Sequence, residues 1–134
     1  MGRGALAVAL AVTAVAHTHG GTQTAKPTEK IDPVAVVGCL KEGAGGTWML
    51  VNASDPIPST ANAPTPKELA ELDTPGRNEL QLIGASIFNL PAHRNHWLVV
   101  KGLPIKATPV SRLNVTSVTM KAESCPPPPP PKIG

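Results

Sequence analysis

Five short segments rich in apolar and β-branched residues stand out along the chain, each bounded by glycine, proline or polar residues. Residues 34–40 form a continuous apolar run, whereas residues 79–85 alternate between apolar and polar positions, as a half-exposed strand does. The predicted strands cover residues 34–40, 47–52, 79–85, 97–102 and 113–121. In the last strand the apolar positions change phase after Val115, which indicates a β-bulge near Thr116 and Ser117.

Residues 53–77, between the second and third predicted strands, interrupt this pattern. Five prolines exclude the segment from the interior of a sheet, and we predict no strand in it. Thr65-Pro66-Lys67-Glu68 has the residues of a capping box with proline at the first helical position. We expect a short helix on the rim of the sheet, or a mobile loop that forms it in part, with Glu68, Glu71 and Asp73 on its solvated face. Residues 103–111, which contain two prolines, are predicted to be a loop.

The order of the predicted elements is three strands, a short turn at residues 91–94, and two strands. This is the order of the OB-fold, a five-stranded, partly open barrel. We therefore predict an all-β domain over residues 33–125, a small five-stranded OB-like barrel with residues 53–77 as a short helical insertion between its second and third strands. In this topology the first and fifth strands run the same way, which places Cys39 and Cys125 at one end.

The N-terminus has the features of a secretory signal peptide at residues 1–16. Arg3 supplies the positive start, the apolar run that follows is too short to span a bilayer, and Ala14-Val15-Ala16 matches a cleavage site. The alternative is a buried N-terminal helix, but the polar segment 17–32 follows at once and is expected to be a flexible lead-in. We therefore predict a periplasmic or secreted protein, and no other segment is long enough to be a transmembrane anchor.

Export determines what the two cysteines mean. In an oxidising compartment, a single pair far apart in sequence is most simply one disulfide, Cys39–Cys125. Val36-Val37-Gly38-Cys39 resembles a bacterial lipobox, but charged residues separate it from the apolar run of the signal, so lipidation is not expected. Beyond Cys125 six prolines begin the tail, residues 126–134, which we expect to be an extended polyproline II segment.

A frame of short motifs along residues 34–125 resembles small secreted bacterial proteins of uncharacterised function. The motifs are Gly38-Cys39-Leu40, Gly46-Thr47-Trp48-Met49-Leu50, Leu82-Ile83-Gly84, Leu90 with His93 and His96, Val100-Lys101-Gly102, Leu113-Asn114-Val115-Thr116-Ser117-Val118 and Ser124-Cys125. The insertion at 53–77 departs from this pattern. The resemblance implies an exported OB-like fold and implies no reaction.

Composition argues against catalysis and against nucleic acid as a partner. The chain carries a net charge of +3, and its basic residues are dispersed rather than gathered into a stripe. The aromatic side chains that could stack on bases or sugars are only Trp48, Phe88 and Trp97. No nucleophile-elbow, zinc-protease or phosphate-loop motif is present. We predict a protein that is not an enzyme and that needs no cofactor.

Metal binding has weak candidates. His93 and His96 have a spacing that would put two imidazoles on one side of a helical turn, although two exposed histidines on a polar cap explain it more simply. His17-Thr18-His19 could chelate copper or nickel weakly, or be solvated tail. Trp48, Met49, Met120 and His96 are the residue types of a Cu(I) carrier, but Trp48 and Met49 are adjacent and face opposite sides of their strand.

These observations predict a non-enzymatic, monomeric, secreted or periplasmic binding module for an unknown small ligand or protein partner. The alternatives are a periplasmic copper- or zinc-binding protein and an oligonucleotide- or glycan-binding OB domain. Asn52-Ala53-Ser54 and Asn114-Val115-Thr116 match the glycosylation sequon, which carries no expectation in a bacterial protein.

Overall fold

The structure is a computed structural model and describes residues 2, 4 and 31–131. Apart from residues 2 and 4, the predicted signal peptide and most of the predicted lead-in therefore lie outside the described residues. The described fold lies in a compact unit that begins at Ile31. No helix in this part of the chain has both the length and the apolar character needed to cross a membrane.

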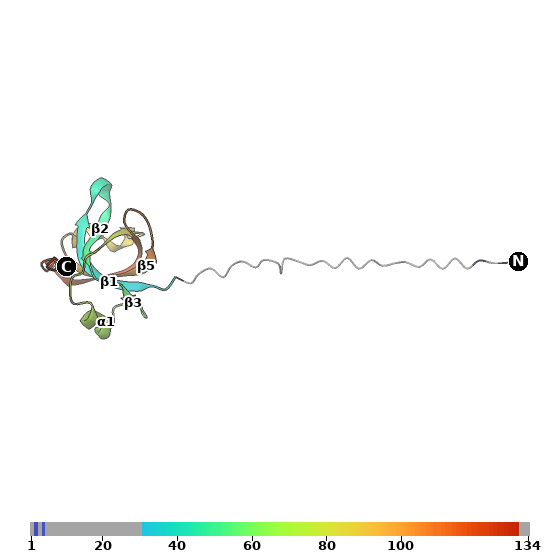
Figure 1. Cartoon of the computed structure of the whole chain (residues 1–134), viewed down its shortest axis with the longest axis horizontal. Coiled ribbons are helices and arrows are strands. Elements are labelled where there is room, and N and C mark those ends of the chain that lie inside the picture. The colour runs from blue at the N-terminus through green and yellow to red at the C-terminus, as the bar shows by residue number, and fades with distance from the viewer. Residues whose placement is uncertain (1, 3, 5–30, 132–134) are drawn as a thin grey trace. The chain divides into compact units, whose positions relative to one another are not determined.

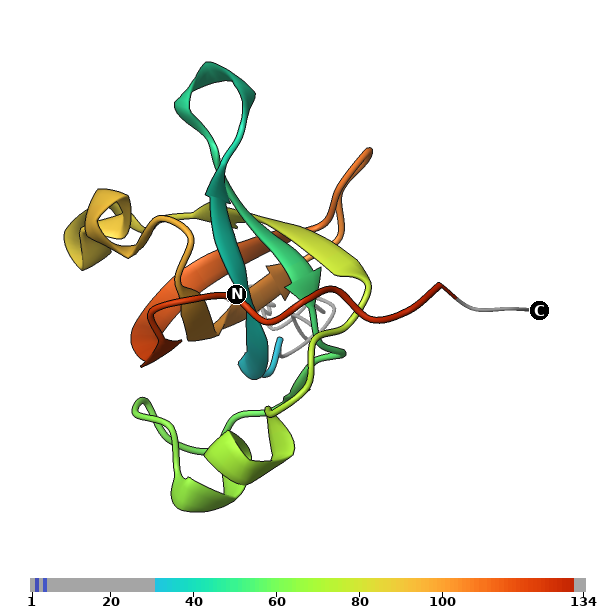
Figure 2. The same ribbon diagram turned by 90° about the vertical axis from the view of Figure 1, so that its left-hand side faces the viewer.

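The described unit is mainly β, as the sequence predicts, with six strands in one sheet and one short α-helix. The elements are β1 (Val34–Glu42), β2 (Trp48–Ala53), β3 (Ile57–Pro58), α1 (Pro66–Glu71), β4 (Asn78–Ile83), β5 (Trp97–Ile105) and β6 (Arg112–Ala122), with short 3-10 helices η1 (Ala44–Gly46), η2 (Ser86–Phe88) and η3 (Leu90–His93). The sheet order is β2-β4-β6-β5-β1-β3, and an additional pairing joins β2 to β1. Strand pairing therefore closes a ring through β1, β2, β4, β6 and β5 (Figures 1 and 2).

The prediction that residues 53–77 contain no strand is wrong, because β3 pairs with the start of β1, Ile57 lying opposite Ala35 and Pro58 opposite Val34. Prolines are tolerated there because β3 is the last strand of the sheet and needs hydrogen bonds on one side only. The predicted loop at residues 103–111 is wrong at its start for a similar reason. β5 continues to Ile105 with Pro104 opposite Leu113, beyond the point where its pairing with β1 ends.

The bulge predicted near Thr116 and Ser117 is confirmed. Lys101 pairs with Ser117 and Gly102 pairs with Val115, so Thr116 is the extra residue on β6. The bulge restores the phase of the strand, because Val118 packs against the same core cluster to which Leu113 and Val115 belong.

Two hydrophobic clusters lie on the two faces of β1 and β5. The inner cluster takes residues from all five strands of the ring: Val36, Leu40, Leu50, Ala53, Leu82, Leu98, Val100, Leu113 and Val115, with Leu90 of η3. The outer cluster contains Ala35, Val37, Cys39, Trp97 and Val99 from the other face of the two strands, together with Leu72 at the end of α1. The continuous apolar run in the sequence of β1 therefore reflects burial on both faces.

Leu69 and Leu72 pack helix α1 against the outer cluster. Hydrogen bonds fix both of its ends. The predicted capping box is present, since the Thr65 hydroxyl accepts a hydrogen bond from Glu68 N (3.2 Å) and Glu68 Oε1 accepts one from Thr65 N (2.8 Å). At the other end, Lys121 of β6 donates to the carbonyl oxygens of Leu69 (2.8 Å) and Leu72. The short helix predicted in the insertion is therefore present, and it packs against the outer face of the sheet.

Candidate functional site

The most deeply buried charged groups are Lys101 of β5 and Glu68 of α1. Lys101 Nζ lies 2.8 Å from Glu68 Oε1, and the two side chains are 1% and 8% exposed. Lys101 Nζ also donates to the carbonyl oxygens of Ala61 (2.7 Å) and Ala63 (3.2 Å). The expectation that Glu68 lies on a solvated helix face is wrong, because the capping box turns its carboxylate back toward the N-terminus of α1 and toward the sheet.

This ion pair is structural. The three protons of the ammonium have three acceptors, so Lys101 has no free donor for a substrate. The hydrogen bond from Lys101, and then that from the Thr65 backbone, lowers the pKa of Glu68 against the opposing effect of burial. Glu68 is therefore a carboxylate, although its Oε2 has no hydrogen-bond partner within the described part of the chain. The pair attaches residues 61–68 to β5.

The candidate binding site is a cleft of about 550 Å³ beside the ends of β2 and β4. Its apolar lining comes from Trp48, Leu82, Leu90 and Pro91, and Ser86 and Asn89 add polar groups. Trp48 lies directly opposite Leu82 across the β2–β4 pair. The cleft is broadly open to solvent, and its volume and mainly apolar lining fall in the range of small-molecule sites.

Charged residues adjoin Trp48. The Arg94 guanidinium lies 5.8 Å from the centroid of the Trp48 ring, within the range of a cation–π contact. The same guanidinium is 2.6 Å from Glu42 Oε2 at the end of β1. Because both charged side chains are about half exposed, the pair contributes little to stability but holds Arg94 over the indole.

His93 and His96 lie together, and they are not the two exposed histidines that the sequence favours. Both are half-buried, and their Nδ1 atoms are 3.4 Å apart with the rings edge to face at 72°. The backbone around them is tied to β1: Asn95 N donates to Leu40 O (2.8 Å), and Leu40 N donates to His96 O (3.1 Å). His96 N donates to His93 O (3.0 Å), which closes the turn.

The other residues considered for copper are not brought together with the histidines by strand pairing. Met49 is on β2 and lies opposite Lys41 and Gln81, whereas Met120 is on β6 opposite Leu98, and β2 and β6 are not neighbours. His17-Thr18-His19 lies outside the described residues. Within residues 31–131, no group of three or more His, Cys, Asp or Glu side chains is placed to hold a metal ion.

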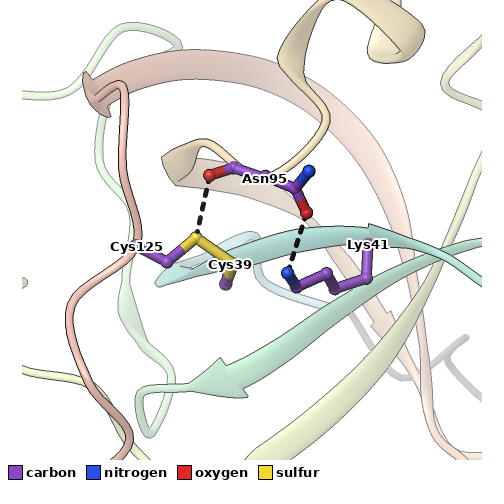
Figure 3. Close-up of a disulfide and its surroundings, with 4 residues drawn as sticks. All are labelled: Cys39, Lys41, Asn95 and Cys125. Carbon is purple, nitrogen blue, oxygen red and sulfur yellow. Dashed lines mark hydrogen bonds between the residues drawn. A yellow bond between two sulfur atoms is a disulfide. The ribbon is translucent and has the colours of Figure 1, made fainter.

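Cys39 and Cys125, which are 86 positions apart in the sequence, form a disulfide with Cα atoms 5.6 Å apart. Figure 3 shows Asn95 between the disulfide and Lys41. The Asn95 side-chain oxygen accepts a hydrogen bond from Lys41 Nζ (2.8 Å), and its carbonyl oxygen lies 3.2 Å from Cys125 Sγ. The turn that carries the histidines is therefore fixed to β1 and contacts the disulfide.

Sequence reasoning identified the cysteines and the histidines but missed the ion pair and the Trp48 cleft. A lysine within the apolar segment Leu98-Val99-Val100-Lys101 was the available signal for the ion pair, because such a strand position is buried. Two of the motif glycines, Gly38 and Gly102, are explained by packing. A Cβ on Gly38 would lie 2.5 Å from Leu50 Cγ, and one on Gly102 would lie 2.2 Å from the Asn114 carbonyl oxygen. These motif residues therefore serve the fold.

Comparisons of the chain with protein-family models, with curated proteins and with solved structures find no match.

Proposed function

We propose that this chain is an exported, non-enzymatic, OB-like module that binds a small amphipathic molecule in the Trp48 cleft. The observation that carries the proposal is the cleft itself, which has a volume of about 550 Å³ and a mainly apolar lining to which Ser86 and Asn89 also belong. A ligand that fits has an apolar ring or short chain and one uncharged hydrogen-bonding group.

The position of the cleft supports this proposal. In OB-folds, oligomeric ligands bind across the face of the second and third strands. Here β2 and β4 are the second and third strands of the ring in chain order, and each contributes to the cleft, through Trp48 and Leu82. The five-strand ring and the parallel pairing of β4 with β6 agree with an OB-like order.

A small ligand is favoured over an oligonucleotide or a glycan chain by the distribution of aromatic rings. Trp97 is 4% exposed in the outer cluster, and Phe88 packs against the inner cluster. Trp48 is thus the one aromatic side chain lining the cleft, enough to stack on a single ring but not on successive bases or sugars.

The proposal that the chain is not an enzyme rests on the structural contacts that its partly or fully buried charged side chains make. Lys101 and Glu68 hold the insertion to the sheet, Lys121 binds the end of α1, and Arg94 is held between Glu42 and Trp48. Export rests on the predicted signal peptide, and the disulfide is compatible with an oxidising compartment.

The test uses Trp48 as its own reporter. In a Trp97→Phe variant, Trp48 is the only indole, so its fluorescence reports on the cleft. The probes are cyclohexanol and N-acetylglucosamine, followed by fluorescence and by Tm, and indole, phenol and adenosine, followed by Tm alone because they absorb or emit in the range of the reporter. Each is titrated to about ten times a Kd of about 1 mM. We expect one of the small amphipathic probes to raise the Tm and, where the probe is transparent, to change the fluorescence.

Two variants locate the binding. Trp48→Ala, measured by Tm, should remove the effect of the probe. Ile105→Ala is the matched control, because Ile105 lines a different cleft of about 320 Å³ with Pro104 and Lys106. Binding that survives Trp48→Ala, or a panel that contains no binder at these concentrations, would refute the proposal.

A further inference from the structure

The imidazoles of His93, the last residue of η3, and of His96, in the turn that follows, lie with the same ring nitrogen close together. His93 Nδ1 and His96 Nδ1 are 3.4 Å apart. An N–H donor and its acceptor in a protein are normally about 2.7–3.2 Å apart, so the contact is long for a shared proton.

The separation matches that of two ligands on one metal ion. Zinc binds imidazole nitrogen at about 2.0–2.1 Å, and a tetrahedral angle at the metal then places two such nitrogens about 3.3–3.4 Å apart. The observed distance of 3.4 Å falls at this value. An ion bound by both Nδ1 atoms at these distances therefore requires no change in their separation.

The backbone already holds the rings in this arrangement. The hydrogen bond from His96 N to His93 O closes the turn, and the reciprocal bonds of Leu40 and Asn95 attach it to β1. Both histidines are half-buried, which restricts their side chains before any ligand arrives. A preorganised pair loses less conformational entropy on binding than two free side chains would.

The nearby cations are engaged elsewhere. Arg94 lies between the two histidines in sequence, but its guanidinium is paired with Glu42 and rests over Trp48. Lys41 donates to the side chain of Asn95. Both cations are therefore held by partners other than the imidazoles.

We propose that His93 and His96 form a two-imidazole chelate for a borderline divalent cation of the Zn²⁺ class, bound through the two Nδ1 atoms. Water would complete the coordination, because no third His, Cys, Asp or Glu joins the pair to form a metal-binding group in the portion described by the structure. The site is separate from ligand binding in the cleft, although Arg94 connects the turn to Trp48.

Zinc titration tests the proposal in the full chain carrying His17→Ala and His19→Ala, which removes the other pair of histidines. Competition with a chromophoric zinc indicator should show one ion per chain. His93→Gln and His96→Gln should each weaken binding about tenfold or more, equivalent to about 1.4 kcal/mol, because losing either ring destroys the chelate. Glu71→Gln, an exposed carboxylate on α1, is the matched control and should leave the affinity unchanged.

A second measurement uses the unaltered imidazoles and so does not depend on the variants folding. Long-range ¹H–¹⁵N spectra of the His17→Ala/His19→Ala chain should show that Zn²⁺ shifts the Nδ1 resonances of both remaining histidines together. Zinc that shifts Nε2 resonances instead, zinc that leaves both rings unchanged, or an affinity equal in folded His93→Gln and the parent would overturn the proposal.

Discussion

Replacing Lys101 by Met is the sharpest test of how the insertion is held to the sheet. The substitution keeps the unbranched apolar part of the side chain but removes the ammonium, leaving the Glu68 carboxylate 8% exposed with one remaining hydrogen bond, from Thr65 N. Breaking a buried ion pair by removing one partner costs about 3–5 kcal/mol, because an uncompensated charge remains buried. The carbonyl oxygens of Ala61 and Ala63 lose a donor as well, but these residues are exposed and water can replace it.

A double variant separates the charge from the packing. Glu68→Gln preserves the capping box, since glutamine can fill the same role, and it removes the buried negative charge. A neutral buried group without a partner costs about 1–3 kcal/mol, less than a buried charge. Lys101→Met with Glu68→Gln should therefore be about 2 kcal/mol more stable than Lys101→Met alone.

Urea unfolding followed by tryptophan fluorescence measures both effects, because Trp97 lies in the outer cluster that the insertion covers. If Lys101→Met lowers the free energy of unfolding by less than about 1 kcal/mol, the pair contributes no more than a solvated surface ion pair does, and its burial is refuted. A double variant less stable than Lys101→Met would contradict the assignment of the cost to the charge.

Further predictions concern acid, the disulfide and the packing of the ring. The pKa of Glu68 is lowered in the folded protein. Ionised Glu68 therefore stabilises the fold above its unfolded pKa of about 4.3, and this stabilisation is lost as the pH falls through the lower folded pKa. The urea midpoint should fall in acid, and it should fall less in the Glu68→Gln variant. Reduction of Cys39–Cys125, which are 86 positions apart, should lower the free energy of unfolding by about 2–4 kcal/mol, and an unchanged urea midpoint would contradict this. Gly38→Ala should lower the free energy of unfolding by about 1–3 kcal/mol, because the new Cβ would lie 2.5 Å from Leu50 Cγ. Adding Leu50→Ala should relieve this clash, but the double variant should stay less stable than the parent because the Leu50 side chain no longer packs in the core.

The sequence predicts the strands of the ring well because each depends on its own residues. Alternation identifies β4, and the change of phase after Val115 identifies the bulge at Thr116. The edge strand β3 and the end of β5 are harder to predict. Whether Pro58 or Pro104 can lie in a strand depends on which side of that strand has a neighbour, and local composition does not contain that information.

The candidate site is less predictable because it depends on pairs distant in sequence. The spacing of His93 and His96 is visible in the sequence. The short distance between their Nδ1 atoms depends on the hydrogen bonds that attach the turn to β1. Lys101 and Glu68 are 33 positions apart and meet only because α1 crosses the outer face of β5. Sequence can indicate that a lysine in an apolar strand needs a partner, but it does not identify which carboxylate supplies one.

The disulfide joins β1 to the segment that follows β6, and it encloses residues 39–125, most of the folded unit, in a covalently closed loop. Two of its exposed turns, η1 at the tip of the β1–β2 hairpin and residues 60–63 ahead of α1, both lie inside that loop (Figure 2). A protease that cuts once at either place would leave two fragments still linked through Cys39 and Cys125. Non-reducing electrophoresis would then show one band where reducing electrophoresis shows two, and the nicked protein could refold as a single molecule.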